Sequence, residues 1–165
     1  MWRIYDHTQP WAQAPGFTPL DGNGGLFATG RWNKRGTRMV YAAQSAALVT
    51  LEVLAHVPPP LFGERTLVKI QATDPSMEHI STQSFLALIR DARDPDREEL
   101  TQDYGSQWAR EERSLLLKVP SVIIPHDHNY LINPAHPEAS ALRLELSERI
   151  RLDRRLLREG KDQTS

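Results

Sequence analysis

MVYAAQSAALVTLEVLAHVPPP, residues 39–60, predicts a buried strand followed directly by a helix. Met39 to Ala42 is short and apolar, as expected of a buried strand. From Ser45 to His56 the residues are good helix formers, and the Ser45 hydroxyl is placed to cap the amino end. The three prolines at 58–60 end the helical pattern. This strand and helix form the middle of the predicted fold.

The predicted helix carries a carboxylate on its apolar side. At about 100° per residue, Leu48, Leu51 and Ala55 form one face. Glu52 falls at about +40° from Leu48, inside this apolar stripe rather than opposite it. We therefore expect the Glu52 carboxylate to point where a leucine would ordinarily lie. The alternative is a charge at the helix edge that reaches out to water.

Four further segments of the amino-terminal part have recognisable patterns. Trp2 to Tyr5 alternates large apolar and polar residues, which predicts a first strand. Asp21 to Gly36 holds five of the nine glycines, a density that lets the backbone approach a ligand closely. Thr66 to Ala72 alternates as a half-buried strand does. Asp91 to Glu99 is predicted to be a charged connection that contains a proline.

The carboxyl-terminal part predicts more strands and a short tail. Leu115 to Val119 and Ser121 to Ile124 are β-type runs, and Pro120 between them implies an edge, a bulge or a bend. The leucines from 142 to 146 alternate as in a strand. Residues 150–157 are expected to form a short helical or irregular segment after it.

Length and composition favour one domain of ordinary size. The 165 residues are enough for a single core, which we assign to residues 1–158, with a disordered polar tail at 159–165. Twenty basic and twenty-one acidic residues give a formal charge of −1. No global field therefore draws this chain to nucleic acid or to an anionic membrane. Any association with DNA is expected to come through a partner.

The absence of cysteine excludes several chemistries at once. Without cysteine there is no disulfide, no thiolate metal site and no cysteine nucleophile. The segment from Met1 to Asp6 contains Arg3 and lacks the apolar stretch of a secretory signal. No apolar run is long enough to span a bilayer. The sequence predicts a soluble, cytoplasmic protein with no membrane contact.

Four polar or aromatic residues occupy positions that suit chemistry. They are Arg31 in the glycine-rich stretch, Tyr41 on the following strand, Glu52 on the helix and Ser121 after Pro120. Each alone has an ordinary explanation: a surface arginine, a core aromatic, a helix-edge charge and a strand hydroxyl. Their combination indicates a site.

The chain resembles the RES domain family, whose toxins pair with Xre-type antitoxins. The resemblance is carried, in the expected order, by GGLFATGRWNKRGTRMVYAA, ALVTLEVLAHV, SLLLKVPSVIIP and NYLINPAHP. It implies a single α+β domain like the ADP-ribosyltransferase toxins, with a split, mostly antiparallel sheet flanked by helices. It also implies activity on NAD⁺, with Arg31, Tyr41, Glu52 and Ser121 as the catalytic residues.

Breaking the nicotinamide–ribose bond calls for these residue types. Positive charge builds on the ribose in the transition state, so a carboxylate such as Glu52 stabilises it. Arg31 matches the pyrophosphate oxygens of NAD⁺ with its planar fork of donors. Tyr41 offers a ring that stacks on nicotinamide or ribose. Ser121 either holds the ribose hydroxyls or orients Glu52 by a hydrogen bond.

Three further residues are predicted to border NAD⁺ together with Arg31, Tyr41 and Ser121. They are Trp32, His56 and Asn133. His56, one turn after Glu52, is equally well explained as a structural histidine. Asn133 is alternatively a residue that ties its turn to its own backbone. We expect no metal site, because neither Glu52 with His56 nor the His-Asp-His at 126–128 matches a zinc pattern.

Three functions remain open at the level of sequence. The first is a toxin that consumes NAD⁺ as a glycohydrolase or phosphorylase, passing ADP-ribose to water or phosphate. The second is a mono-ADP-ribosyltransferase that modifies a protein, for example phosphoribosyl pyrophosphate synthetase. The third is a catalytically silent NAD⁺-binding or interaction module. In the first two, an Xre-like antitoxin is the expected partner, blocking the NAD⁺ cleft and supplying any DNA binding.

Overall fold

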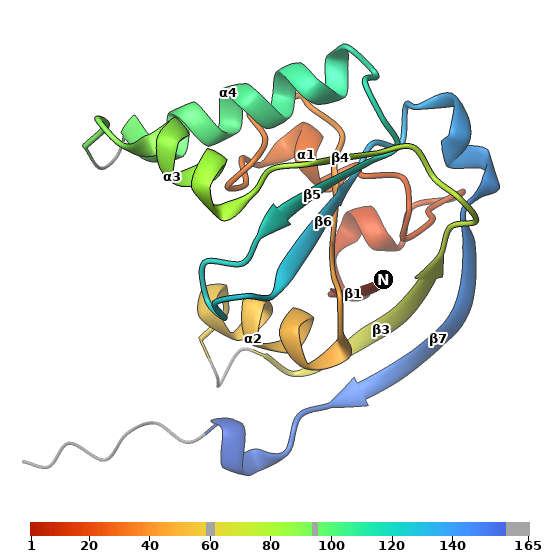
Figure 1. Ribbon diagram of the computed structural model, residues 1–165. Helices are drawn as coiled ribbons and strands as arrows, with labels where there is room; N and C mark the ends of the chain where they lie inside the picture. The colour runs from red at the N-terminus through yellow and green to blue at the C-terminus, as the bar shows by residue number, and fades with distance from the viewer. Residues whose placement is uncertain (59–61, 94–95, 158–165) are drawn as a thin grey trace, which may run out of the picture.

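The computed structural model describes residues 1–58, 62–93 and 96–157, which are organised around one seven-stranded sheet (Figure 1). The strand order is β4-β5-β6-β2-β1-β3-β7. Only the β4–β5 pair is parallel among these neighbours. The strands are β1 (Trp2–Tyr5), β2 (Val40–Ala43), β3 (Glu64–Gln71), β4 (Met77–His79), β5 (Leu116–Pro120), β6 (His128–Ile132) and β7 (Arg143–Arg151).

Helices and short 3₁₀ turns lie between the strands and after the last one, β7. The α-helices are α1 (Gly24–Phe27), α2 (Ala46–His56), α3 (Thr82–Ile89) and α4 (Asp96–Arg110). The 3₁₀ turns are η1 (Pro10–Ala12), η3 (Pro137–Ala141) and η4 (Arg154–Leu157). The prediction of a single α+β domain with a mostly antiparallel sheet is therefore confirmed. The proposed boundary at residue 158 and the tail at 159–165 lie outside the described residues.

The sheet is nearly divided between β1 and β2. The register of these two strands consists of Trp2 opposite Ala43, whereas β1 pairs with β3 along its whole length. Two sub-sheets, β4-β5-β6-β2 and β1-β3-β7, thus meet through a short seam. This seam agrees with the split sheet expected from the sequence.

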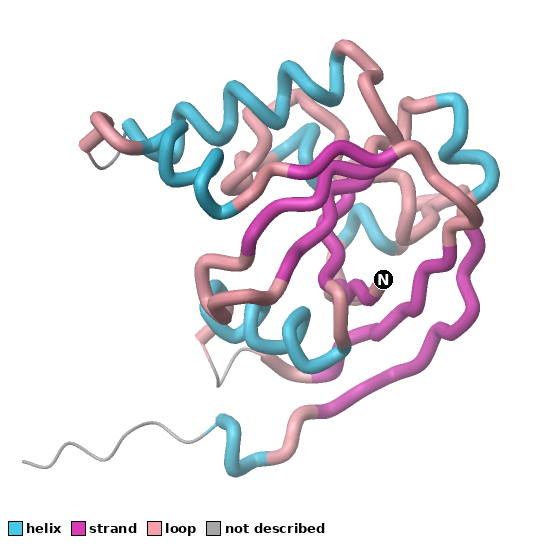
Figure 2. Tube along the Cα trace, in the orientation of Figure 1, coloured by secondary structure: helices cyan, strands magenta, loops and turns pink. Residues whose placement is uncertain are grey.

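The helices cover two separate regions of the same sheet face. α3 packs on α4 and on β5, while α2 packs on β1 and β2 (Figure 2). Tyr41, Leu117 and Leu131 face the α3–α4 layer, in a core that includes Trp108. The core beneath α2 contains Ile4, Ala43 and Leu67, among others. The opposite face forms a third core around Val40, Val68 and Ile132, together with residues before β2 and after β6.

The predicted helix α2 is confirmed, but its buried face differs from the prediction. The Ser45 hydroxyl accepts a hydrogen bond from Leu48 N at 3.1 Å, as an N-cap does. Leu48 and Val49 are the buried side chains, whereas Leu51 is 39% exposed. The predicted buried face of α2 was therefore wrong. The observed face includes Val49 in place of Leu51, because the sheet lies on the Leu48–Val49 side. Glu52 still borders the buried face, since it is one turn from both of these residues.

Two predictions about irregular segments and strands are wrong. Residues 96–99 do not belong to a connection but begin α4, where acidic side chains suit the positive helix end. Thr101, Gly105 and Trp108 then follow one another on the buried face of α4. Residues 121–124 form a turn instead of a strand, because the Ser121 hydroxyl accepts the backbone N–H groups of residues 123 and 124. The proline bend predicted before this turn is the point where β5 ends.

The remaining strand predictions are confirmed with shifted ends. β1 has the predicted bounds, while β2 and β3 differ from their predictions by one or two residues. The carboxyl-terminal strand β7 is longer than the leucine alternation indicated. It is followed by η4, in agreement with the short helical segment expected there. α3 has no counterpart among the elements predicted from the sequence.

Gly105 gives a direct test of how α4 approaches the glycine-rich loop. A Cβ at this position would overlap the backbone carbonyl of Trp32. We expect Gly105→Ala to lower the free energy of unfolding by about 1–3 kcal/mol, the usual cost of overpacking. Helix propensity alone predicts the opposite, a gain of about 1 kcal/mol. Urea unfolding measures the difference.

The matched control is Gly24→Ala, because a Cβ at Gly24 would meet nothing within 4 Å. Its unfolding free energy should change by less than about 0.5 kcal/mol. An increase in stability for Gly105→Ala would contradict the close packing of α4 on the loop.

Candidate functional site

Two hydrogen bonds hold the carboxylate of Glu52 through one of its oxygens. Ser121 Oγ donates to Glu52 Oε1 at 2.8 Å, and Asn129 Nδ2 donates to the same oxygen at 2.5 Å. Within the described residues, Glu52 Oε2 accepts no hydrogen bond and is not sealed from solvent. One oxygen is thus restrained while the other is available to a ligand.

Ser121 reaches Glu52 from the turn that follows β5. Its hydroxyl accepts from the N–H groups of Ile123 and Ile124, both at 3.1 Å, so its own proton is directed to Glu52. The Ser121 N–H donates to Asp127 O at 2.9 Å across the turn. Of the two roles predicted for Ser121, the contact with Glu52 is present in the structure. Direct binding of ribose stays a prediction.

Asn129 is a residue that the sequence analysis did not single out. It lies in β6 opposite Ala43 of β2 and Val119 of β5, so pairing on both sides fixes its backbone. Its Oδ1 is buried and has no hydrogen-bond partner among the described residues. The available signal was an amide residue at the start of the motif NYLINPAHP, on the same strand face as the core residue Leu131.

Tyr41 fixes the glycine-rich loop to the sheet. Its hydroxyl accepts a hydrogen bond from Trp32 N at 3.1 Å and donates to Asn33 Oδ1 at 2.7 Å. A Cβ at Gly30 would collide with this hydroxyl, so the glycine is needed for the close approach. Burial raises the pKa of the Tyr41 phenol far above 10.0, while the hydrogen bond from Trp32 and the nearby Arg31 guanidinium lower it by less. Tyr41 is therefore a neutral donor at physiological pH.

Arg31 is held by its backbone and exposes its side chain. Thr101 Oγ1 of α4 donates to Arg31 O at 2.6 Å. Ser106, five residues further along α4, accepts from Lys34 N at 2.8 Å. The loop is therefore clamped between α4 and Tyr41, and the Arg31 guanidinium projects from a rigid backbone into solvent.

The sheet register relates this loop to the Glu52 carboxylate. Tyr41 lies opposite Leu131, two residues along β6 from Asn129, so both side chains point to the same sheet face. Such diagonal neighbours are separated by roughly 7–8 Å between Cα atoms. The structure thus brings Glu52, Ser121 and Asn129 together and places Tyr41, with the Arg31 loop, one diagonal step away.

The other residues predicted to bind NAD⁺ have different surroundings. Trp32 is 3% exposed and packs against Phe85 and Tyr104, with ring centroids 5.8 and 6.4 Å away. Its visible role is in the core, and the predicted ligand contact is not supported by this burial. His56 is exposed at the end of α2, one turn beyond Glu52.

Asn133 uses its side chain to hold the protein together. Its Nδ2 donates to Ala109 O of α4 at 2.8 Å, and its Oδ1 accepts from Ala135 N at 3.0 Å. The alternative reading, an asparagine that ties its own turn, therefore describes its contacts. Contact with NAD⁺ by Asn133 stays a prediction that these contacts do not favour.

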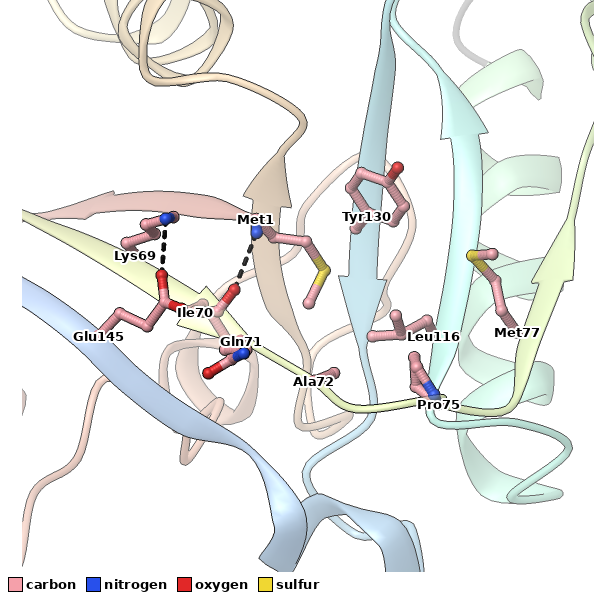
Figure 3. Close-up of a pocket in the computed structure, with 10 residues that line it drawn as sticks. All are labelled: Met1, Lys69, Ile70, Gln71, Ala72, Pro75, Met77, Leu116, Tyr130 and Glu145. Carbon is pink, nitrogen blue, oxygen red and sulfur yellow. Dashed lines mark hydrogen bonds and ion pairs between the residues drawn. The ribbon is translucent and has the colours of Figure 1, made fainter.

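Two surface cavities lie away from this site. The first, about 360 Å³, is lined by Met1, Ile70, Leu116 and Tyr130, among others (Figure 3). Tyr130 and Leu116 point to the sheet face opposite Asn129, since they alternate with residues of the α3–α4 core. The second, about 350 Å³, lies between α3 and α4. A cleft shared by Arg31 and Glu52 stays a prediction.

In residues 1–58, 62–93 and 96–157, no three histidine, aspartate or glutamate side chains are grouped closely enough to hold a metal ion. None of the helices in that part of the chain is long and apolar enough to cross a membrane.

A comparison with known protein families assigns the chain to one of them. The model of the RES domain matches residues 1–154. The chain belongs to the RES domain family. The family resemblance noted from the sequence motifs is therefore confirmed, and the match includes every residue of the site described above.

Curated relatives of this RES domain cover most of its length. A Prs ADP-ribosylating toxin of Sphingobium sp. (strain YBL2) is 39% identical over 146 residues, which are 86% of this chain and 88% of that protein. A Toxin Res of Pseudomonas putida (strain KT2440) is 33% identical over 135 residues, which are 80% of this chain and 89% of that protein.

The RES domain also has a structural neighbour. It is similar to a chain in the crystal structure of the M. tuberculosis MbcT–MbcA toxin–antitoxin complex, with a TM-score of 0.69. The match covers 90% of this chain and 82% of that chain at 19% identity. At this identity the likeness shows the fold alone, and it supports the α+β architecture.

The raised pKa of Tyr41 predicts an alkaline loss of stability. The folded protein keeps the phenol proton above pH 10.0, where the unfolded chain releases it. This contribution is therefore complete below pH 10.0 and is lost as the pH rises further. Tyr41→Phe should lose about 1–3 kcal/mol at pH 7, because two polar groups lose their partner, and should show a weaker decline up to pH 11.

Denaturant unfolding between pH 7 and pH 11 measures both effects. Tyr130→Phe is the control, because the Tyr130 hydroxyl makes no hydrogen bond within the described part of the chain. Equal stability of the Tyr41→Phe and Tyr130→Phe proteins across this range would contradict the role of Tyr41 in holding the loop.

Proposed function

We propose that this protein is the toxin of a toxin–antitoxin pair and transfers ADP-ribose from NAD⁺ to a protein acceptor. The observation that carries the proposal is the Glu52 carboxylate, restrained through Oε1 by Ser121 and Asn129 while Oε2 is left open. The names of the relatives, a Prs ADP-ribosylating toxin and a Toxin Res, support it.

Glu52 acts on the bond between nicotinamide and ribose. As this bond breaks, its electron pair leaves with the neutral nicotinamide and positive charge builds on the ribose. A negative oxygen fixed beside that ribose stabilises the transition state more than the ground state. The acceptor then forms the new bond to the ribose carbon, and its proton passes to Glu52 or to solvent.

Arg31 and Tyr41 act on the rest of the dinucleotide. The Arg31 guanidinium is exposed on a loop whose backbone is fixed by Thr101 and Tyr41, so binding the pyrophosphate has to order the side chain but not the loop. Tyr41 contributes by holding this loop. Stacking of its ring on nicotinamide remains part of the sequence-based proposal.

The choice of acceptor separates two enzymes that share this first step. The name of the Sphingobium relative favours transfer to a protein, which the sequence analysis held as its alternative. Destruction of NAD⁺, with water or inorganic phosphate as acceptor, is the second candidate. It is favoured by Glu52 Oε2, which accepts no hydrogen bond within the described residues and could accept the proton of a small nucleophile.

A labelling experiment tests the catalytic role of Glu52 and the acceptor together. The purified protein is incubated with NAD⁺ labelled in its adenosine phosphate, with cell lysate, and the label is followed to protein, to ADP-ribose or to its phosphate ester. We expect label on protein. Glu52→Gln should reduce all products by at least about 100-fold, the usual loss for a key electrostatic group, with an unchanged fold.

Glu148→Gln is the matched control, because Glu148 is exposed on β7 and its side chain makes no hydrogen bond or ion pair within the described residues. It should retain wild-type turnover. Undiminished turnover by Glu52→Gln would refute the assigned role. Label found only on ADP-ribose or its phosphate ester would replace transfer to protein with NAD⁺ destruction.

Growth distinguishes a toxin from a silent NAD⁺-binding module. Expression of the protein without an antitoxin should arrest growth and lower cellular NAD⁺, and co-expression of the Xre-like antitoxin should restore both. Expression of Glu52→Gln should leave growth unaffected. Normal growth and normal NAD⁺ during wild-type expression would favour the silent module.

A further inference from the structure

We propose that Asn129 is a positioning residue that, together with Ser121, holds Glu52 for the reaction on NAD⁺. The inference rests on the function proposed above. It assigns a role to a residue that the motif analysis did not select and that makes the shorter of the two side-chain contacts to Glu52.

The two donors come from a single structural unit. Ser121 follows the end of β5 and Asn129 lies near the start of β6, so the β5–β6 connection closes on Glu52 from both of its ends. Because both donors bind Oε1, the carboxylate can neither rotate nor exchange its oxygens without losing both bonds. Oε2 of Glu52 therefore stays in one fixed position.

The contact of Asn129 Nδ2 with Glu52 leaves the amide oxygen of Asn129 in an unfavourable environment. Asn129 Oδ1 is buried and accepts no hydrogen bond within the described residues. An unsatisfied buried acceptor costs about 1–3 kcal/mol, and such groups are rare in native structures. An amide that retains this cost while its N–H group binds a carboxylate fits a residue kept for positioning.

Two substitutions that differ in charge distinguish a positioning role for Asn129 from a role in filling space. Asn129→Asp preserves the size and shape of the side chain but replaces the N–H donor with a carboxylate oxygen that repels Glu52. Asn129→Ala removes the donor without adding charge. A side chain that only fills space would tolerate aspartate better than alanine, whereas positioning predicts the reverse order.

Steady-state NAD⁺ cleavage by the purified full chain tests this order. At pH 8, Asn129→Ala should lower kcat by about 10- to 100-fold with KM within about threefold of wild type, as expected for a misplaced catalytic group. Asn129→Asp should be slower still. On acidification to pH 5 its deficit relative to wild type should shrink, because a protonated aspartic acid again donates to Glu52.

The deficit of Asn129→Ala has no such rescue and should stay constant with pH. Matching thermal unfolding curves for the variants and wild type confirm that the fold is kept. Wild-type kcat for Asn129→Asp, or equal losses for both variants at every pH, would overturn the proposal.

A second measurement stands apart from catalysis. In the wild-type amide spectrum, one Asn129 side-chain proton should resonate downfield, as expected for a short hydrogen bond to a charged oxygen. Glu52→Gln should move it upfield, while Glu148→Gln should not. If wild-type protein fails to cleave NAD⁺, the proposed function falls, and this resonance alone decides whether Asn129 holds Glu52. No difference between the two glutamine variants would overturn the contact.

Discussion

The site depends on one carboxylate oxygen that accepts two hydrogen bonds. Ser121 and Asn129 converge on Glu52 Oε1 from the two ends of the β5–β6 connection, while α2 carries Glu52 to the border of the core. Partial burial of a carboxylate costs free energy that such donors offset, and charge-assisted hydrogen bonds are about twice as strong as neutral ones. Fixing one oxygen leaves the second in a defined position. The helix α2, the turn after β5 and the first residues of β6 are therefore all needed to hold the Glu52 carboxylate in place.

A second constraint positions the glycine-rich loop. Thr101 and Ser106 of α4 make hydrogen bonds to the loop backbone. Gly105 of α4 lies where any larger residue would collide with that backbone. Tyr41 holds the same loop from the sheet through its hydroxyl. The loop is therefore rigid although it is rich in glycine, and its exposed arginine side chain extends from a fixed base. Both constraints meet on one face of the sheet, because Tyr41 and Asn129 are diagonal neighbours on adjacent strands.

The sequence predicted those features that local patterns encode. The N-cap at Ser45, the helix after it and the strand β3 are encoded locally, and the structure confirmed these elements, although β3 is buried on both faces at residues 65–68 and not on one face as predicted. The buried side of α2 was misjudged because it depends on where the sheet lies, and the Ser121 segment was misread because side-chain hydrogen bonds replaced the strand ladder. Asn129 was missed for a similar reason. An asparagine in a strand has no distinctive local pattern, and its importance arises from a contact with a residue 77 positions away.

The proposed function requires that Glu52 faces the ribose of NAD⁺ while the Arg31 loop binds the pyrophosphate. A crystal structure of the Glu52→Gln protein with bound NAD⁺ tests it most directly. We expect the ribose next to the side chain at position 52, with Ser121 and Asn129 still in contact with that side chain, and the pyrophosphate against Arg31. NAD⁺ bound instead in the cavity beside Tyr130, on the opposite sheet face, would contradict it.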